Sequence, residues 1–320
     1  MKRSIILSLL LFCCIGLFAQ STEEKKWIDK AKSLNESEDY RGSLSAYLKA
    51  YKLNPKNAET LYQIAWTYND VDVYDSALIF AQKGLAVDSK DERLYNESGY
   101  AYRKQSKYVK AIGEYEAAYK INPKNKTSIK GLGDSYKKNK DFDDALVYYK
   151  KYLLLDDENA DVYYSMGWVY NEQKEYEAAE KKLLKAIDLD PKKADAYNEL
   201  GYCYSKLKNS DESLYYYKKA SDADPESGVY YFNVAYTYYA KDPKDVDNAI
   251  DWYEKGIEYD QTDALSYYRL GWCYNDKDMY TKARDVLAKS VKLDDSQTDA
   301  LTELGYSYYK LEENPKAINT

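Results

Sequence analysis

Aromatic, apolar and small residues return along this chain at a fixed interval of 34 residues. The motif Tyr-x-x-Leu-Gly-x-x-Tyr occupies residues 197–204, and a version with methionine in place of leucine occupies residues 163–170. Prolines keep the same interval, since Pro191 and Pro225 are 34 residues apart. A period in this range predicts a stack of equivalent two-helix repeats. Such a stack offers an extended binding surface and no ready-made catalytic pocket.

Aligning the chain on the glycine of the 197–204 motif places nine repeats in one register. Their first residues are Glu24, Ala58, Glu92, Lys126, Ala160, Ala194, Gly228, Ala264 and Thr298. Eight complete repeats fill residues 24–297, and a ninth, truncated repeat fills residues 298–320. The seventh repeat is two residues longer than the others. Its insertion falls near residues 241–244, where Pro243 predicts a loop between two helices.

Two positions of the repeat are especially regular. The eighth is always glycine or alanine, at Ala31, Ala65, Gly99, Gly133, Gly167, Gly201, Ala235, Gly271 and Gly305. The eleventh is tyrosine in every repeat but the first, at Tyr68, Tyr102, Tyr136, Tyr170, Tyr204, Tyr238, Tyr274 and Tyr308. Small residues allow the two helices of a hairpin to approach closely. The tyrosine ring is expected to fill the space between neighbouring hairpins.

These markers, together with a small residue at the twentieth position, resemble the tetratricopeptide repeat (TPR) over residues 24–320. The resemblance implies an all-α, right-handed solenoid of antiparallel helix hairpins with a 34-residue period. It also implies a concave groove, lined by the first helices, that binds proteins or extended peptides. The fourth repeat departs from the pattern, because Tyr152 replaces a small residue and Asp157 replaces the closing proline. We therefore expect the angle between the fourth and fifth repeats to differ from the others.

The first 19 residues have the pattern of a secretory signal peptide. Two cations at residues 2–3 precede an apolar run over residues 5–18, and cleavage is expected after Ala19. The run is short for a bilayer span, so we expect no transmembrane helix in the mature chain. A retained anchor and lipid attachment at Cys13 or Cys14 are the alternatives. The pattern indicates an exported TPR protein of the secreted bacterial type, in the periplasm, the cell envelope or outside the cell.

Composition argues against several classes of function. The net charge of −7 disfavours nucleic acid as a partner. The chain contains no histidine, which is the commonest general base and zinc ligand. After the expected cleavage only Cys203 and Cys273 remain, and we interpret them as small buried residues. We therefore predict no catalytic residue, no metal site and no cofactor.

A block of three repeats is duplicated inside the array. Trp66 and Trp168 are 102 residues apart, three times the period, and Trp272 lies a further 104 residues on, across the insertion. In the TPR family the second, fifth, ninth, twelfth and thirteenth positions of the first helix line the groove. The partner-binding residues predicted on this basis are Tyr62, Trp66, Asn69, Asp70, Tyr100, Arg103, Lys130, Tyr164, Trp168, Asn171, Glu172, Tyr202, Tyr236, Tyr268, Trp272, Asn275 and Asp276.

Two interpretations of this stripe stay open. The rings could stack on one another and stiffen the array. They could instead form a ligand surface on which Asn69, Asn171 and Asn275 hydrogen-bond the backbone of the ligand. The basic residues around Arg103 and Lys130 likewise suggest either a site for an acidic peptide or a solvated charged face.

The sequence therefore predicts a non-catalytic scaffold that binds proteins or extended peptides through its groove. One alternative is a glycan-binding or polysaccharide-export module, because sugars stack on aromatic rings. Another is the N-terminal targeting arm of a larger enzyme that continues beyond Thr320.

Overall fold

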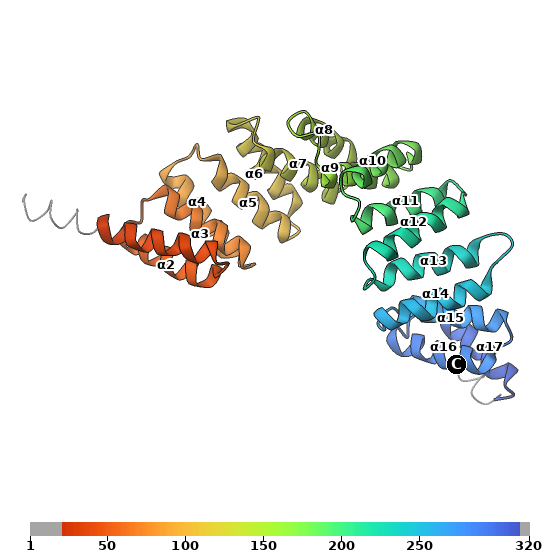
Figure 1. Ribbon diagram of the computed structural model, residues 1–320. Coiled ribbons are helices and arrows are strands. Elements are labelled where there is room, and N and C mark those ends of the chain that lie inside the picture. The colour runs from red at the N-terminus through yellow and green to blue at the C-terminus, as the bar shows by residue number, and fades with distance from the viewer. Residues whose placement is uncertain (1–20, 314–320) are drawn as a thin grey trace, which may run out of the picture. The chain divides into compact units, whose positions relative to one another are not determined.

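The computed structural model describes residues 21–313 of the 320-residue chain. Within this range the chain consists of helices and short connections, with no strand (Figure 1). The prediction of an all-α repeat fold is confirmed. The predicted signal peptide, the cysteines at positions 13 and 14 and the end of the ninth repeat lie outside the described residues.

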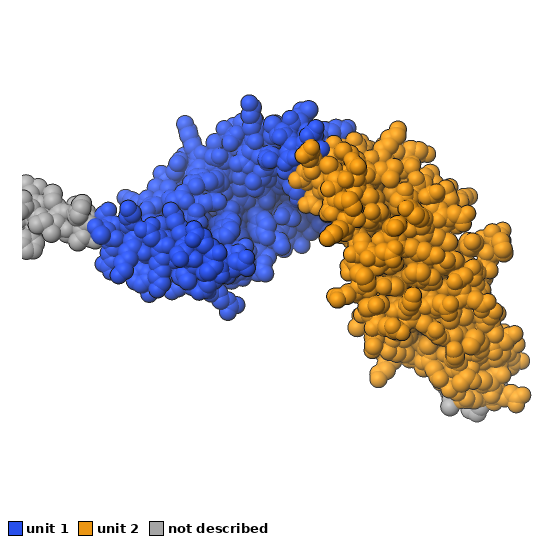
Figure 2. Space-filling view, in the orientation of Figure 1, with its two compact units in different colours: residues 1–157 blue, residues 158–320 orange. Residues whose placement is uncertain are grey.

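The chain divides into two compact units, residues 1–157 and 158–320, which Figure 2 shows in different colours. In the N-terminal unit, a helix that ends at residue 36 precedes the remaining helices. These are α2 (Tyr40–Leu53), α3 (Ala58–Asp70), α4 (Tyr74–Val87), α5 (Glu92–Lys104), α6 (Tyr108–Ile121), α7 (Lys126–Asn139) and α8 (Phe142–Leu153).

The C-terminal unit continues the same alternation of first and second helices. Its helices are α9 (Ala160–Glu172), α10 (Tyr176–Leu189), α11 (Ala194–Lys206), α12 (Ser210–Ala223), α13 (Gly228–Ala240), α14 (Val246–Tyr259), α15 (Ala264–Asp276), α16 (Tyr280–Leu293) and α17 (Thr298–Lys310).

From the second repeat onward, each first helix begins at the residue where the 34-residue period places the start of the repeat. Side chains just before these helices fix several of the starts. The carboxamide oxygens of Asn57, Asn125 and Asn159 each accept a hydrogen bond from the backbone N–H three residues on, at 3.0–3.1 Å. Such a cap satisfies one of the amide groups that the first helical turn leaves without a partner.

All but one of the described hairpins turn through a residue in the left-handed region of backbone conformation, and these residues recur with the period of the repeat. They are Glu38, Asp72, Ser106, Lys140, Lys174, Lys208, Asp278 and Glu312. Just after this residue, a backbone N–H bonds the carbonyl of the eleventh position, as from Glu175 to Tyr170 at 2.8 Å. This is the six-residue bond that ends a helix in a Schellman turn. Only the seventh repeat lacks the left-handed residue among the described hairpin turns, and its loop is the one lengthened by two residues.

The small residue at the eighth position makes room for a large side chain of the same hairpin. A Cβ atom added at Gly201 would lie 2.6 Å from Cδ1 of Tyr217 on the second helix. The tyrosine at the eleventh position contacts both its own hairpin and the preceding one. The ring of Tyr204 stacks on Tyr216 of its own hairpin at 5.4 Å, and its hydroxyl donates to Glu180 of the preceding hairpin at 2.6 Å. The Tyr204 side chain also packs against the buried cluster that includes Ala179 and Leu183 of that preceding hairpin, as predicted.

The fourth repeat has a shorter second helix than its neighbours. Its second helix, α8, has 12 residues where the second helices of the neighbouring repeats have 14. Tyr152 is buried, and Leu154 just beyond the helix is 85% exposed. The boundary between the two compact units follows at Asp157. The sequence departure and this boundary therefore fall at the same junction, while the predicted difference in angle stays a prediction.

Candidate functional site

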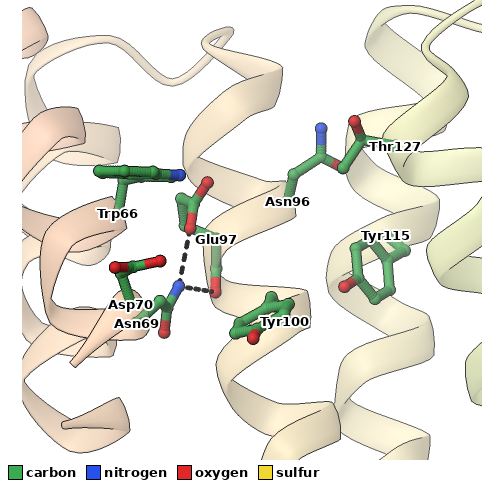
Figure 3. A pocket seen from close by; sticks show the side chains of 8 residues that line it. All are labelled: Trp66, Asn69, Asp70, Asn96, Glu97, Tyr100, Tyr115 and Thr127. Atoms are coloured by element: carbon green, nitrogen blue, oxygen red, sulfur yellow. Dashed lines mark hydrogen bonds between the residues drawn. The ribbon is translucent and has the colours of Figure 1, made fainter. Parts of the chain in front are cut away.

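Two adjoining hollows lie on the first helices of the N-terminal unit. The first has a volume of about 270 Å³ and receives two carboxylates, and we call it the acidic hollow (Figure 3). It is lined by Trp66, Asn69 and Asp70 of α3, Asn96, Glu97 and Tyr100 of α5, Tyr115 of α6 and Thr127 of α7. Side chains from three successive first helices thus meet at one place.

The second hollow, which we call the basic hollow, has a volume of about 350 Å³ and shares Tyr100, Tyr115 and Thr127 with the first. Its other lining residues are Arg103, Lys126, Lys130, Gly131, Asp134 and Tyr152. The structure therefore brings together, in this unit, the predicted residues Trp66, Asn69, Asp70, Tyr100, Arg103 and Lys130. Tyr62 lies outside both linings and packs against the Arg93 guanidinium, 4.3 Å from its ring centre.

The predicted role of the three asparagines in binding a ligand backbone is wrong. Nδ2 of Asn69 donates to the backbone oxygen of Glu97 at 3.0 Å and to its carboxylate at 2.7 Å (Figure 3). Asn171 and Asn275 make the same pair of bonds to the glutamates 28 residues further on, Glu199 and Glu303. All three asparagines are buried, so their amide groups join one first helix to the next.

Burial and the hydrogen bond from Asn69 shift the pKa of Glu97 in opposite directions. Burial removes the carboxylate from water and is the larger effect, while the hydrogen bond from Asn69 favours the charged form. The net result raises the pKa of Glu97 to about 7. The charge of the acidic hollow therefore changes near neutral pH.

Aromatic rings at the acidic hollow contact other rings and cations. Trp66 packs edge-on against Tyr40 of α2, with ring centres 6.0 Å apart. Tyr100 lies 6.5 Å from Tyr74 and carries the Arg103 guanidinium 5.4 Å from its ring centre. These contacts hold the rings at fixed positions on the surface of the first helices.

The cations of the basic hollow are largely neutralised. Lys126 pairs with Asp156 at 3.0 Å, and Lys130 pairs with Asp134 at 3.1 Å. Burial alone lowers the pKa of Arg103, but interactions with Tyr115 and Asp134 raise it above its ordinary value. The arrangement fits the interpretation of a charged face balanced by nearby acids.

Three predicted residues of the C-terminal unit form a cluster on α15, the first helix of the eighth repeat of the chain. They are Tyr268, Trp272 and Asp276. Trp272 lies 4.9 Å from Tyr239 and 6.2 Å from Tyr268 between ring centres. The Tyr239 hydroxyl donates to Asp276 at 2.7 Å. The pair that joins two repeats, Tyr239 and Trp272, is tilted, whereas the stacked pair, Tyr268 and Trp272, lies within α15. Trp272 keeps 37% of its surface exposed.

The remaining predicted residues of this unit lie at two further places. On α9, Tyr164 and Trp168 are half-buried and Glu172 is exposed, and Lys193 lies 5.3 Å from the Tyr164 ring centre. Tyr202 and Tyr236 line a larger hollow of about 710 Å³, which we call the C-terminal hollow. Its other lining residues are Ser205, Lys206, Lys208, Ser210, Tyr217, Asn233, Thr237, Ala240, Lys241, Asp242 and Arg269.

The prediction missed Tyr115 and Tyr217, which form the floor of the hollows from second helices. Both rings are buried, and each fills the space over the glycine at the eighth position of its own repeat. That glycine is the signal in the sequence that a bulky residue faces it. The hollow on α14, lined by Trp252 and its neighbours, belongs to a single helix and does not join successive repeats.

Across residues 21–313, no group of three or more cysteine, aspartate or glutamate side chains could hold a metal ion. Cys203 and Cys273 are buried and free, as predicted, and burial raises the pKa of each thiol to about 12. None of the described helices is long and apolar enough to cross a membrane.

Comparisons with known proteins agree with this architecture. The family model described as TPR repeat matches residues 167–208, and the one described as tetratricopeptide repeat matches residues 92–125, 131–159 and 194–227. Residues 242–320 match the model of anaphase-promoting complex, cyclosome, subunit 3. No curated protein matches the sequence.

Several solved structures share the fold at low sequence identity. The C-terminal part of a TPR repeat-containing protein from Cytophaga hutchinsonii aligns at 20% identity with a TM-score of 0.61, covering 76% of this chain and 99% of that chain. A TPR protein from Parabacteroides merdae aligns at 19% identity with a TM-score of 0.59. The alignment covers 78% of this chain and 98% of that chain.

The Cut9–Hcn1 hetero-tetramer of the APC/C aligns at 15% identity and a TM-score of 0.58, covering 84% of this chain, which spans 52% of that one. Identities this low show the fold alone. The repeat models and the helix hairpins show that this chain contains tetratricopeptide repeats.

Proposed function

We propose that this chain is a non-catalytic scaffold that binds extended segments of partner proteins through the exposed face of its first helices, in the cell envelope or outside the cell. One observation carries the binding part of the proposal. Within each unit, side chains from three successive first helices gather at the hollows, from α3, α5 and α7 in the first and from α11, α13 and α15 in the second. A segment that runs across the repeats can contact all three helices of a unit at once.

The internal bonds of the array favour such binding. The paired hydrogen bonds from Asn69 to Glu97 and from Asn171 to Glu199 fasten first helices to each other before any ligand arrives. A surface that is already ordered loses less entropy when a ligand binds. The rings of Trp66, Tyr100 and Trp272 then supply contact area beside polar groups.

Affinity capture with the mature chain tests the binding surface. A variant with Trp66, Trp168 and Trp272 changed to alanine is compared with a control variant, Tyr215→Ala, whose ring is 53% exposed on the second helix α12. We expect partners to be lost only from the triple variant, with the helical circular dichroism of both variants unchanged. An identical set of captured proteins from all three chains would contradict the proposal. A glycan array run in parallel identifies the alternative, since binding of sugars without any peptide would replace a protein ligand by a glycan.

The proposed location rests on the sequence of residues 1–19 alone. Fusion of a periplasm-dependent enzyme reporter to the C-terminus of the whole chain measures it. We expect reporter activity that disappears when residues 2–19 are deleted. Full reporter activity without that segment, or none with it, would refute the export part of the proposal and leave the binding part standing.

A further inference from the structure

The C-terminal hollow carries an excess of positive charge in a chain whose net charge is −7. Four cationic side chains line it, Lys206, Lys208, Lys241 and Arg269, against a single carboxylate, that of Asp242. An acidic chain that collects cations at one place gives that place an electrostatic preference opposite to the rest of its surface.

These cations are not neutralised by the protein itself. Within the described residues, no carboxylate makes an ion pair with Lys206, Lys208 or Arg269, and Lys241 reaches Asp211 only at 4.0 Å. Asp211 is also highly exposed, so solvent weakens that pair. The positive charge therefore remains available to a ligand.

The basic hollow of the N-terminal unit provides the contrast. It lies at the corresponding junction one three-repeat block earlier, with Tyr100 and Tyr115 in the places of Tyr202 and Tyr217. There the two lysines are held by aspartates at 3.0 and 3.1 Å. The corresponding junctions of the two units thus differ, because, among the described residues, both lysines of one hollow are ion-paired and three of the four cations of the other are not.

Aromatic rings hold two of the available cations in place without neutralising them. Nζ of Lys206 lies 5.0 Å from the ring centre of Tyr202. Cζ of Arg269 lies 4.4 Å from the ring centre of Tyr236, which is 46% exposed. Cation–π contacts of this kind orient the charged groups through the face of the ring and use none of their N–H donors.

Two uncharged groups of the lining are already bonded within the protein. Nδ2 of Asn233 donates to Oδ1 of Asn198 at 2.7 Å, and the Thr237 hydroxyl donates to the Asn233 backbone oxygen at 2.7 Å. The Asn233 and Thr237 side chains therefore shape the hollow. The lysines and the arginine are the groups that can bind a negatively charged ligand. The two-residue insertion of the seventh repeat adds to the same lining, because Lys241 and Asp242 belong to the lengthened loop.

We propose that the C-terminal hollow binds the carboxylates of an acidic peptide segment, with Lys206 and Arg269 as its principal contacts. The inference rests on the proposed function, since the segment crosses the repeats on the face of the first helices. A volume of about 710 Å³ lies within the range of sites that enclose small ligands. We do not expect nucleic acid to be the ligand of this hollow, because the net negative charge of the chain repels a long polyanion.

Fluorescence anisotropy with labelled decapeptides tests the assignment. Peptides alternating serine with glutamate, glutamine or lysine are titrated with the full chain at low ionic strength. We expect only the glutamate peptide to bind, and its affinity to fall as salt is raised to physiological strength, because screening weakens contacts between charges. The double variant Lys206→Gln plus Arg269→Gln is expected to weaken binding at least about tenfold.

The matched control is Lys110→Gln plus Lys181→Gln, at exposed positions on the second helices α6 and α10, which is expected to bind the glutamate peptide as the unchanged chain does. Lys208→Gln, at an exposed position, gives a single-site variant that does not disturb the packing of Arg269. It is expected to weaken binding by a smaller factor. Equal binding of the glutamate and glutamine peptides would overturn the inference, and so would loss of binding in the control double variant alone. If tryptophan-dependent capture of partners persists while the glutamate peptide does not bind, this inference fails and the proposed function survives.

Discussion

Replacing Glu97 by glutamine gives the sharpest test of how the first helices are joined. The change removes a charge and keeps an oxygen that can accept the hydrogen bond from Asn69. In the folded chain the pKa of Glu97 is about 7, compared with an ordinary value of 4.5. The folded state therefore holds the proton more tightly than the unfolded chain does. The stability that this proton contributes is complete below about pH 4.5 and is lost as pH rises through 7.

The magnitude follows from the size of the shift. Between pH 5 and pH 8 the free energy of unfolding falls by about 2–3 kcal/mol for a carboxyl whose pKa is 4.5 in the unfolded chain and about 7 in the folded chain. Partial contact of the side chain with water reduces this to about 1–2 kcal/mol. Glu97→Gln should therefore equal the unchanged chain in stability at pH 5 and exceed it by about that amount at pH 8.

Urea denaturation of the full chain, followed by circular dichroism at both pH values, measures the difference. Hydrogen exchange of the amides in α5 reports it locally, which matters because repeat arrays need not unfold in one step. Glu158→Gln, at an exposed position, serves as the control for removal of a charge alone. The reasoning is refuted if the gain from Glu97→Gln is the same at both pH values, or if the variant is less stable at pH 8.

Substitutions at three further positions test the packing of the repeat by thermal denaturation. Gly201→Trp should cost at least about 1–3 kcal/mol, because even a Cβ there would lie 2.6 Å from Tyr217; an unchanged melting temperature would argue against the register. Asn171→Asp should destabilise more than Asn171→Ala at pH 7, since it sets a second carboxylate beside that of Glu199, and the reverse order would remove the proposed link between first helices. Lys174→Gly should raise stability by up to about 1 kcal/mol, because glycine adopts the φ of 63° without strain, whereas a loss would show that the lysine side chain stabilises the turn.

The fold was predictable because its signals repeat. One glycine, such as Gly201, is weak evidence for close helix packing, but a small residue at the same position of every repeat fixes the register of the whole array. The helix starts depend on local capping by residues such as Asn57 and Asn125, which the sequence also displays. The bounds of the helices therefore follow from short-range chemistry.

The candidate site was predictable only in part, because helical periodicity tells which face a residue occupies and not what covers that face. Asn69 lies on the predicted face, yet the next first helix covers it and Glu97 takes its amide group. The sequence did contain a signal, since asparagine in one repeat type is always followed 28 residues later by glutamate in the next. The charge of the C-terminal hollow was missed for a related reason. Arg269 and Lys206 belong to different repeats, so their convergence depends on how the hairpins stack.

Hydrogen exchange of the full chain with and without a captured partner tests the central claim most directly. The account predicts that the partner slows exchange in first helices, at α3, α5 and α7 or at α11, α13 and α15. It also predicts unchanged exchange in α4 and α14, second helices that line none of the acidic, basic and C-terminal hollows. Protection confined to the second helices would contradict it.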